Sequence, residues 1–180
     1  GGFTEDDKNV CIDGGAFIHE GRYVDSLSVK EMSGVQFLSG EAKTAQLTVI
    51  DNDEDVTVVL YNVSADIEPK YIKGKLSFGI RLTADGKYAN SNLSDPEEKS
   101  GRVARLCEKA VTERVNLAIE KTLKARGADP FGFKHSVTSK EYYSWLKIEE
   151  NYGELLKNGT YDVECKVTIR RFSTAHDKQQ

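Results

Sequence analysis

The sequence predicts an α+β fold, in which a mostly antiparallel or mixed sheet packs against one long helix and two shorter ones. Three observations predict it: segments of alternating polarity fill the first half of the chain, helical patterns follow them, and one more alternating segment comes last. Strands and helices segregated in this way are typical of α+β domains rather than of parallel doubly wound ones. The length of 180 residues suits one well-packed domain. We therefore expect a single domain over residues 1–180, with frayed ends at 1–9 and 174–180.

The first elements are a hairpin and a short helix. Residues 10–19 and 22–27 are extended stretches that flank a Glu-Gly turn. The apolar residues that follow recur with helical spacing, with Ser28 as the N-cap and Gly40 as the stop.

Three strands come next, at residues 45–50, 56–67 and 71–82. In the last of these, the apolar residues from Ile72 to Leu82 alternate with polar ones. This alternation predicts one buried and one solvated face.

The long helix is expected over about residues 96–126. Asp95 is placed as its N-cap, Pro96 occupies the first turn, and Glu98 stands where a capping box needs it. An apolar stripe of helical period follows, and Gly127 can take the left-handed conformation that ends a helix.

The segment ADPFGF comes directly after this helix. Pro130 pushes Asp129 out of the helical region, so the chain must turn. Burying the two phenylalanines would contribute roughly 1.5 to 3 kcal/mol each. We therefore expect Phe131, Gly132 and Phe133 to form a structural latch, with both rings in the groove between the long helix and the sheet.

A further helix is expected after the corner. Thr138 and Glu141 have the spacing of a capping box, and Val137 and Tyr142 that of a hydrophobic staple. The helical pattern weakens near residues 151–153 and ends before Asn158.

The aromatic residues of this helix have two interpretations. Tyr142, Tyr143 and Trp145 form a contact patch or belong to the core, and we favour the core because a helix packed on a sheet uses such residues there. The last strand, residues 160–172, alternates apolar and polar side chains.

Composition limits the classes of partner. The chain has 25 basic and 29 acidic residues, a net charge of −4, which supplies no field for attracting nucleic acid. No run of eighteen apolar residues exists, so the chain as given is expected to be soluble. Cys11, Cys107 and Cys165 are widely spaced and lie among apolar neighbours, which favours buried free thiols.

The acidic turn DNDED resembles the start of a calcium loop. Asp51, Asp53 and Asp55 alternate as in such a loop, but Val56 stands where a glycine is needed and Asn62 where a bidentate Glu belongs. We expect a solvated hairpin tip, with weak cation binding as the alternative.

The remaining motifs point away from catalysis. His19, His135 and His176 have no Cys or carboxylate at ligand spacing, and the chain lacks a Gly-x-Ser-x-Gly elbow and a phosphate-binding glycine loop. We predict no catalytic, metal or cofactor site, and therefore no enzyme.

The order of segments resembles a known family. The stretch GGAFIHEGRYVDSLSVKEMSGVQFLSG, a helix entered through LSDPEEK, the corner GADPFGF, a helix with Trp145 and a closing VECKVTIRRF are similar to the C-terminal domain of the Ger(x)C family, from about residue 10 to 173. Ser26 and Leu27 depart from the family's Trp and acidic helix start, whereas Glu31 and Gly34 keep its Glu-x-x-Gly spacing.

The resemblance implies a role in spore germination. Members of this family are lipoprotein C subunits of nutrient germinant receptors. They lie on the outer face of the spore inner membrane and work with two membrane-embedded partner subunits. The resemblance implies that the lipid-bearing cysteine lies upstream of this chain, and it implies no enzyme. The alternative function is a small-molecule (nutrient) binding module.

Cationic side chains are our candidates for docking on a partner or on lipid headgroups. They are Lys73, Lys75 and Arg81 on the predicted third strand, and Arg170 and Arg171 at the end of the last strand. The alternative is a merely solvated sheet face.

Overall fold

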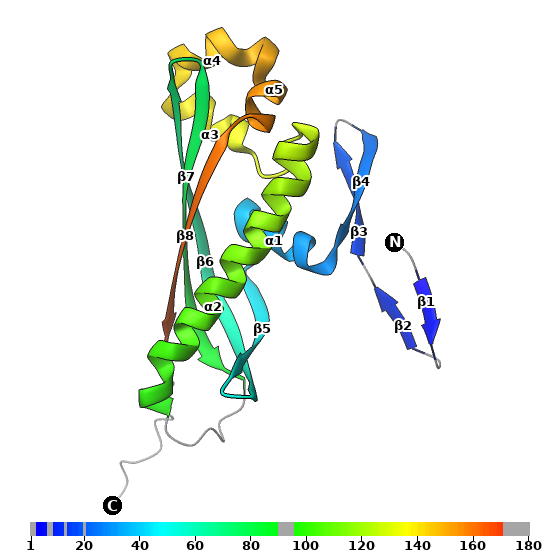
Figure 1. Cartoon of the computed structure of the whole chain (residues 1–180), viewed down its shortest axis with the longest axis vertical. Helices are drawn as coiled ribbons and strands as arrows, with labels where there is room; N and C mark the ends of the chain where they lie inside the picture. The colour runs from blue at the N-terminus through cyan, green and yellow to red at the C-terminus, as the bar shows by residue number, and fades with distance from the viewer. Residues whose placement is uncertain (1–2, 7–8, 13, 20, 90–95, 171–180) are drawn as a thin grey trace, which may run out of the picture.

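A four-stranded mixed sheet forms the body of the protein (Figure 1). The structure, a computed structural model, describes residues 3–6, 9–12, 14–19, 21–89 and 96–170. The sheet has the order β5-β6-β7-β8, with antiparallel pairing except between β7 and β8, which run parallel. Its strands are β5 (Thr44–Asp51), β6 (Glu54–Ile72), β7 (Lys75–Tyr88) and β8 (Thr160–Ile169). A parallel pair needs a crossover, which the helices between β7 and β8 supply. The predicted α+β fold is thus confirmed.

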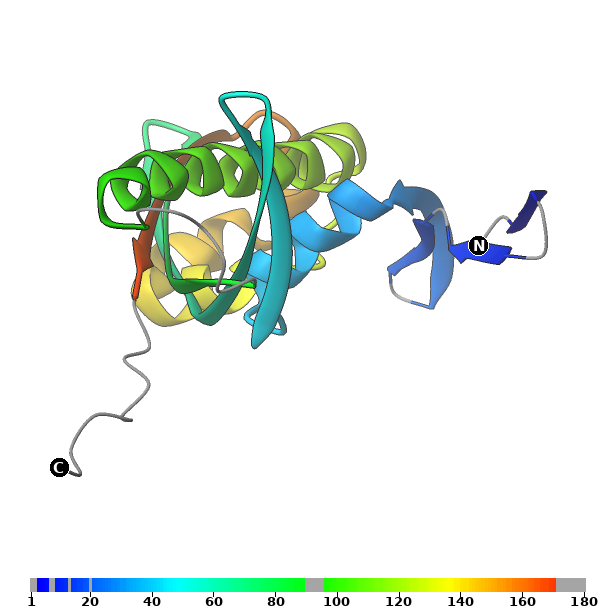
Figure 2. The ribbon, with the colours of Figure 1, turned by 90° about the horizontal axis from the view of Figure 1, so that it is seen from below.

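The long helix crosses the sheet. It comprises α2 (Pro96–Ile119) and a π-helical turn (Glu120–Lys124) and continues to residue 126, as predicted. It contacts both edge strands, β5 and β8, and Figure 2 shows it lying across the strands. Its fully buried residues, Val103, Cys107, Val115, Ala118 and Leu123, share one core with the inward side chains of the sheet. The apolar stripe read from the sequence is therefore the face that packs on the sheet.

Two small hairpins precede the sheet. β3 (Gly14–His19) pairs with β4 (Arg22–Ser28), as predicted, but Asn9–Ile12 forms a separate strand, β2, that pairs with β1 (Phe3–Asp6). The expectation that residues 1–9 and 174–180 fray stays a prediction, and 174–180 lie outside the described residues.

The first helix, α1 (Val29–Ser39), begins and ends as the sequence predicts. Ser28 and Glu31 form a reciprocal capping box, and Gly40 ends the helix with φ 72°. Gly34 packs against the long helix so closely that a Cβ atom there would lie 2.1 Å from the Arg114 carbonyl oxygen. Only glycine fits this contact between α1 and α2.

The predicted third strand was wrong at its start. Lys73 and Gly74 both have positive φ, 51° and 79°, and form a two-residue turn between β6 and β7. A two-residue hairpin turn of this kind needs positive φ at both positions, and glycine at the second adopts it easily. Ile72, expected in the core, is therefore the last residue of β6 and is exposed.

The helix predicted after the corner is divided into three short ones. They are α3 (Phe133–Lys140), α4 (Tyr142–Ile148) and α5 (Tyr152–Lys157), with a 3₁₀ turn at Glu149–Asn151 before α5. The capping box was wrong, because the Thr138 hydroxyl donates to the His135 carbonyl inside α3. The staple was also wrong, since Val137 is buried and Tyr142 is exposed.

The acidic turn is only partly solvated. Asn52 and Asp53 form the turn with positive φ, but Asp51 is buried and its carboxylate accepts two hydrogen bonds from Arg102, at 2.6 and 2.9 Å. Arg102 lowers the pKa of Asp51, chiefly through these hydrogen bonds. The expectation of a wholly solvated tip was therefore wrong at Asp51, which ties the β5–β6 hairpin to α2.

Candidate functional site

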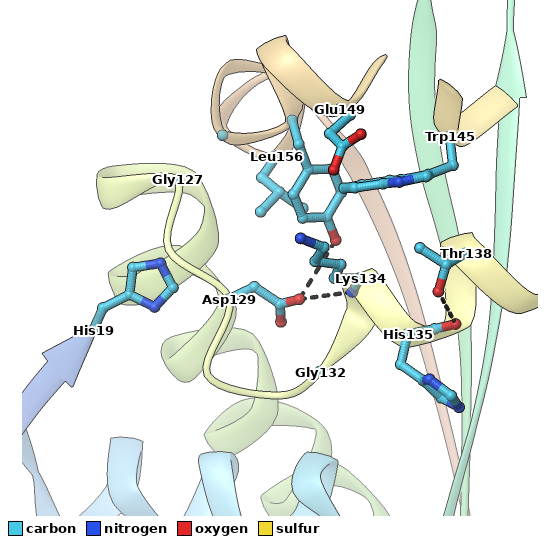
Figure 3. Close-up of a pocket in the computed structure, with 12 residues that line it drawn as sticks. His19, Gly127, Asp129, Gly132, Lys134, His135, Thr138, Trp145, Glu149 and Leu156 are labelled. Atoms are coloured by element: carbon cyan, nitrogen blue, oxygen red, sulfur yellow. Dashed lines mark hydrogen bonds between the residues drawn. The ribbon is translucent and has the colours of Figure 1, made fainter. Parts of the chain in front are cut away.

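A cleft of about 690 Å³ opens beside the ADPFGF corner (Figure 3). It is lined by His19 on β3 and by residues between Gly127 and Leu156, which belong to the corner, α3 and the α4–α5 region. The side chains that matter most for its chemistry are those of His19, Asp129, Lys134, His135, Trp145 and Tyr152. Sequence reasoning did not find this cleft, because no local pattern joins these segments.

Asp129 is the polar centre of the corner. Its carboxylate accepts backbone N–H groups from Phe131 (3.2 Å), Phe133 (3.1 Å) and Lys134 (2.7 Å). The Tyr152 hydroxyl donates to the same carboxylate at 3.5 Å. A carboxylate at the start of a helix satisfies free N–H groups and complements the helix dipole. Asp129 is therefore engaged in holding the first turn of α3.

An aromatic wall faces this carboxylate. Trp145 is almost wholly buried and packs edge-on against Tyr152, with 5.2 Å between the ring centroids. The Lys134 ammonium lies 4.9 Å from the centre of the Trp145 ring, a cation–π contact. Burial raises the pKa of the Tyr152 hydroxyl far above its ordinary value, so this group remains a neutral donor. The cleft thus combines an aromatic surface with charged side chains of both signs, Asp129, Glu149 and Lys134.

Both phenylalanines of the proposed latch belong to the hydrophobic core. Phe133 is fully buried, with ring centroids 4.9 Å from Phe78 on β7 and 6.4 Å from Tyr161 on β8. Phe131 is also buried and packs against Phe133 at 5.4 Å. Gly132 has φ 77°, a conformation that disfavours other residues. The latch role itself stays a prediction.

The candidate docking cations do not form one cluster. Lys73 lies in the β6–β7 turn and Lys75 begins β7, whereas the backbone N–H of Arg170 donates to Gly86 near the other end of β7. Gly86 lies eleven positions after Lys75, which is roughly 36 Å of extended strand. The fifth candidate, Arg171, lies outside the described residues.

The neighbours of the other two cations are acidic. Arg81 stands between Asp66 on β6 and Glu164 on β8 in the strand register. Arg170 donates to Asp85 at 2.7 Å and lowers the pKa of that carboxyl group. Of the candidates that the structure describes, Lys73 and Lys75 are thus the two that lie next to each other.

The histidines and cysteines show no metal or nucleophile arrangement in the described part of the chain. His19 and His135 line the same cleft, but no group of three or more metal-binding side chains occurs among the described residues. Burial raises the pKa of the Cys107 thiol to about 11 and that of Cys165 to about 12, so both stay protonated near neutral pH. His176 and the Cys11 side chain lie outside the described residues. Within the described helices, none is both long and apolar enough to cross a membrane.

Comparisons with known proteins agree with this fold. The crystal structure of the GerBC protein is similar, with a TM-score of 0.79 and 18% sequence identity, over 91% of this chain and 53% of that one. The chain thus spans about half the length of that protein, and the likeness shows the fold. No curated protein matched the sequence.

A family match covers most of the chain. Residues 13–173 match the family described as "Spore germination B3/ GerAC like, C-terminal". This range includes β3 and β4, the whole four-stranded sheet and the ADPFGF corner, but not β1 and β2. The resemblance read from the sequence is therefore confirmed, and the chain belongs to the spore germination B3/GerAC-like C-terminal family.

Proposed function

We propose that the chain is part of a non-enzymatic subunit of a spore nutrient germinant receptor. The family match over residues 13–173 carries this proposal. The subunit acts by contact with two membrane-embedded partner subunits. It lies on the outer face of the spore inner membrane, held there by a lipid on a cysteine upstream of the chain.

The ionisable groups with shifted pKa values support a structural rather than a catalytic use. Asp25, Asp51 and Asp85 each owe a lowered pKa first to an arginine side chain that joins two different elements. Perturbed groups can mark catalytic sites, but ion pairs between elements perturb them equally well. These carboxylates therefore serve to hold the fold together, as expected for a protein that works by contact.

Deleting the subunit tests the proposal. Spores without it should lose germination in response to nutrients, and the wild-type gene should restore it. The tagged subunit should also co-purify with integral membrane proteins from spore membranes. Unchanged nutrient germination in the deletion strain would contradict the proposed function.

The cleft supports a second candidate, a small-molecule binding module. Its volume falls within the roughly 300 to 1,000 Å³ of typical ligand sites. Trp145 is the one tryptophan of the chain and lines this cleft, so its fluorescence reports on an occupant. A saturable change in emission on adding a nutrient, weakened by Lys134→Gln, would favour binding, whereas constant emission would favour the contact role alone.

A further inference from the structure

Large apolar side chains are exposed on two elements at one end of the molecule. On α4, Tyr142 is 56% exposed, Tyr143 82% and Leu146 59%, while Trp145 and Ile148 of the same helix are buried. Ile72, at the end of β6, is 62% exposed. Figure 1 shows α4 and the closed end of the β6–β7 hairpin at the same end of the molecule. The helix thus buries one face and presents an apolar, aromatic face to solvent.

An ion-pair network joins the two parts of this end. The Lys140 ammonium, at the C-terminal end of α3, donates to Asp66, Glu68 and the Ile67 carbonyl on β6, at 3.1, 2.7 and 3.0 Å. α4 begins two residues later. This network therefore holds the end of α3, directly before α4, against residues 66–68 of β6.

Exposed lysines occur on the same two elements, in the β6–β7 hairpin and on α4. We define the tip surface as the exposed residues Lys70, Ile72, Lys73, Lys75, Tyr142, Tyr143, Leu146 and Lys147. None of its four lysines forms an ion pair within the part of the chain that the structure describes.

The carboxylates around the tip surface are mostly engaged elsewhere. Asp66 and Glu68 bind Lys140, and Glu141 accepts the Ser144 hydroxyl. Glu149 and Glu150, directly after α4, are both exposed carboxylates. The tip surface as defined contains four lysines and no carboxylate, although the whole chain has a net charge of −4.

We propose that the tip surface docks on an anionic lipid bilayer. Tyrosines are enriched where a protein meets the boundary between hydrocarbon and water, because the ring is apolar and the hydroxyl is polar. Exposed lysines are attracted to anionic headgroups.

The composition favours a bilayer over a protein partner. Protein interfaces are enriched in arginine and depleted of lysine, whereas all cations of the tip surface are lysines. The end of the β6–β7 hairpin and α4 lie at the same end of the molecule, so one bilayer surface can meet both. The inference adds a specific contact to the proposed function and rests on its membrane location for biological meaning.

Sedimentation with lipid vesicles tests this contact. The purified chain should bind vesicles of phosphatidylcholine with about 30% phosphatidylglycerol more tightly than vesicles of phosphatidylcholine alone, and added salt should weaken the binding. Tyr143→Ser with Leu146→Ser should lower the binding constant about tenfold, because it removes the inserted apolar groups. Lys73→Gln with Lys75→Gln should lower the binding constant several-fold for anionic vesicles and leave it unchanged for vesicles of phosphatidylcholine alone.

Matched controls lie elsewhere on the surface. Tyr23→Ser, at a tyrosine 67% exposed on β4, and Lys109→Gln, on the exposed side of α2, should bind as wild type. If the wild-type protein does not sediment with anionic vesicles, the proposal is overturned. That result would instead favour a protein partner for this surface. Unchanged binding by both tip variants also overturns the proposal. The vesicle test uses the chain alone, so its failure would leave the germination phenotype of the deletion strain standing.

Discussion

The Asp129 side chain, rather than the predicted capping box, sets where the helix after the corner begins. The sequence pattern placed the start of the next helix at Thr138, because Thr138 and Glu141 have capping-box spacing. In the structure the helix begins at Phe133, because the Asp129 carboxylate satisfies the N–H groups of Phe133 and Lys134. A cap that reaches across Pro130 and a left-handed Gly132 has no simple spacing rule, so sequence reasoning missed it.

The two phenylalanines of the corner give a stability prediction. Phe133→Ala and Phe131→Ala should each lower the free energy of unfolding by about 3 to 5 kcal/mol, because each leaves a cavity in the core. Chemical denaturation measures this. Tyr143→Ala is the control, since that ring is exposed and its loss should be nearly neutral. Melting within a degree of wild type for either phenylalanine variant would contradict the latch.

Among the elements, the β3–β4 hairpin is tied to the end of the long helix. Asp25 on β4 accepts a hydrogen bond from Arg126 at 2.8 Å and lies 3.4 Å from Lys121. Arg126 first, and then a backbone N–H and Lys121, lower the pKa of Asp25 from 3.8 to about 2. Because the folded pKa lies below the unfolded one, the stabilisation is complete above pH 3.8 and is lost as the pH falls toward 2.

Asp25→Asn should therefore have a pH-dependent effect. The variant should melt below wild type near neutral pH, and the difference should shrink as the pH falls through the window from 3.8 to about 2. Thermal melts across this range, with Asp53→Asn as a control in an exposed turn, measure it. A difference in melting temperature that stays constant with pH would count against the ion pair.

The β5–β6 turn gives a prediction about metal. Asp53→Asn with Asp55→Asn should leave the melting temperature unchanged with and without calcium, because the loop lacks the glycine and the bidentate Glu of a calcium site. Asp51 is excluded from this test, since its carboxylate is occupied by Arg102. A calcium-dependent rise in melting temperature in wild type but not in the variant would show a site after all.

For the whole molecule, we expect variants that abolish germination to fall into two groups. Substitutions at Phe131, Trp145 or Ile169, which belong to or pack against the core, should lower the amount of the subunit in spores. Charge reversal at the docking candidates should leave its amount normal if they contact a partner or headgroups.

The register separates these candidates into independent tests. Reversing Lys73 and Lys75 changes the charge of the tip surface, whereas reversing Arg170 removes the ion pair with Asp85 and should lower stability. Reversal of Arg81 places a carboxylate between Asp66 and Glu164, and Arg171 is tested in the same way. Subunit abundance and nutrient-triggered germination, measured in the same spores, distinguish the outcomes. Normal germination by the Lys73 and Lys75 variant would return these residues to a merely solvated face.

The sequence by itself determined the elements that depend on near neighbours. The Ser28 and Glu31 cap, the end of α1 at Gly40 and the long helix over residues 96–126 follow from spacing within a few residues. The alternation of β8 follows in the same way, because side chains on a strand point to opposite faces in turn. The order of these elements was also enough to indicate the family.

Only the tertiary structure decided what distant segments do to one another. The ion pair of Asp51 and Arg102 joins residues 51 positions apart, and the cleft brings His19 beside a corner more than a hundred residues later. Tyr142 and Tyr143 were expected in the core, but the break at Glu141 turns α4 so that Trp145 is buried and the tyrosines are exposed. Local patterns show that a residue is apolar or charged. Whether it is buried depends on which surface the rest of the chain brings against it, and that is set by packing over long sequence separations.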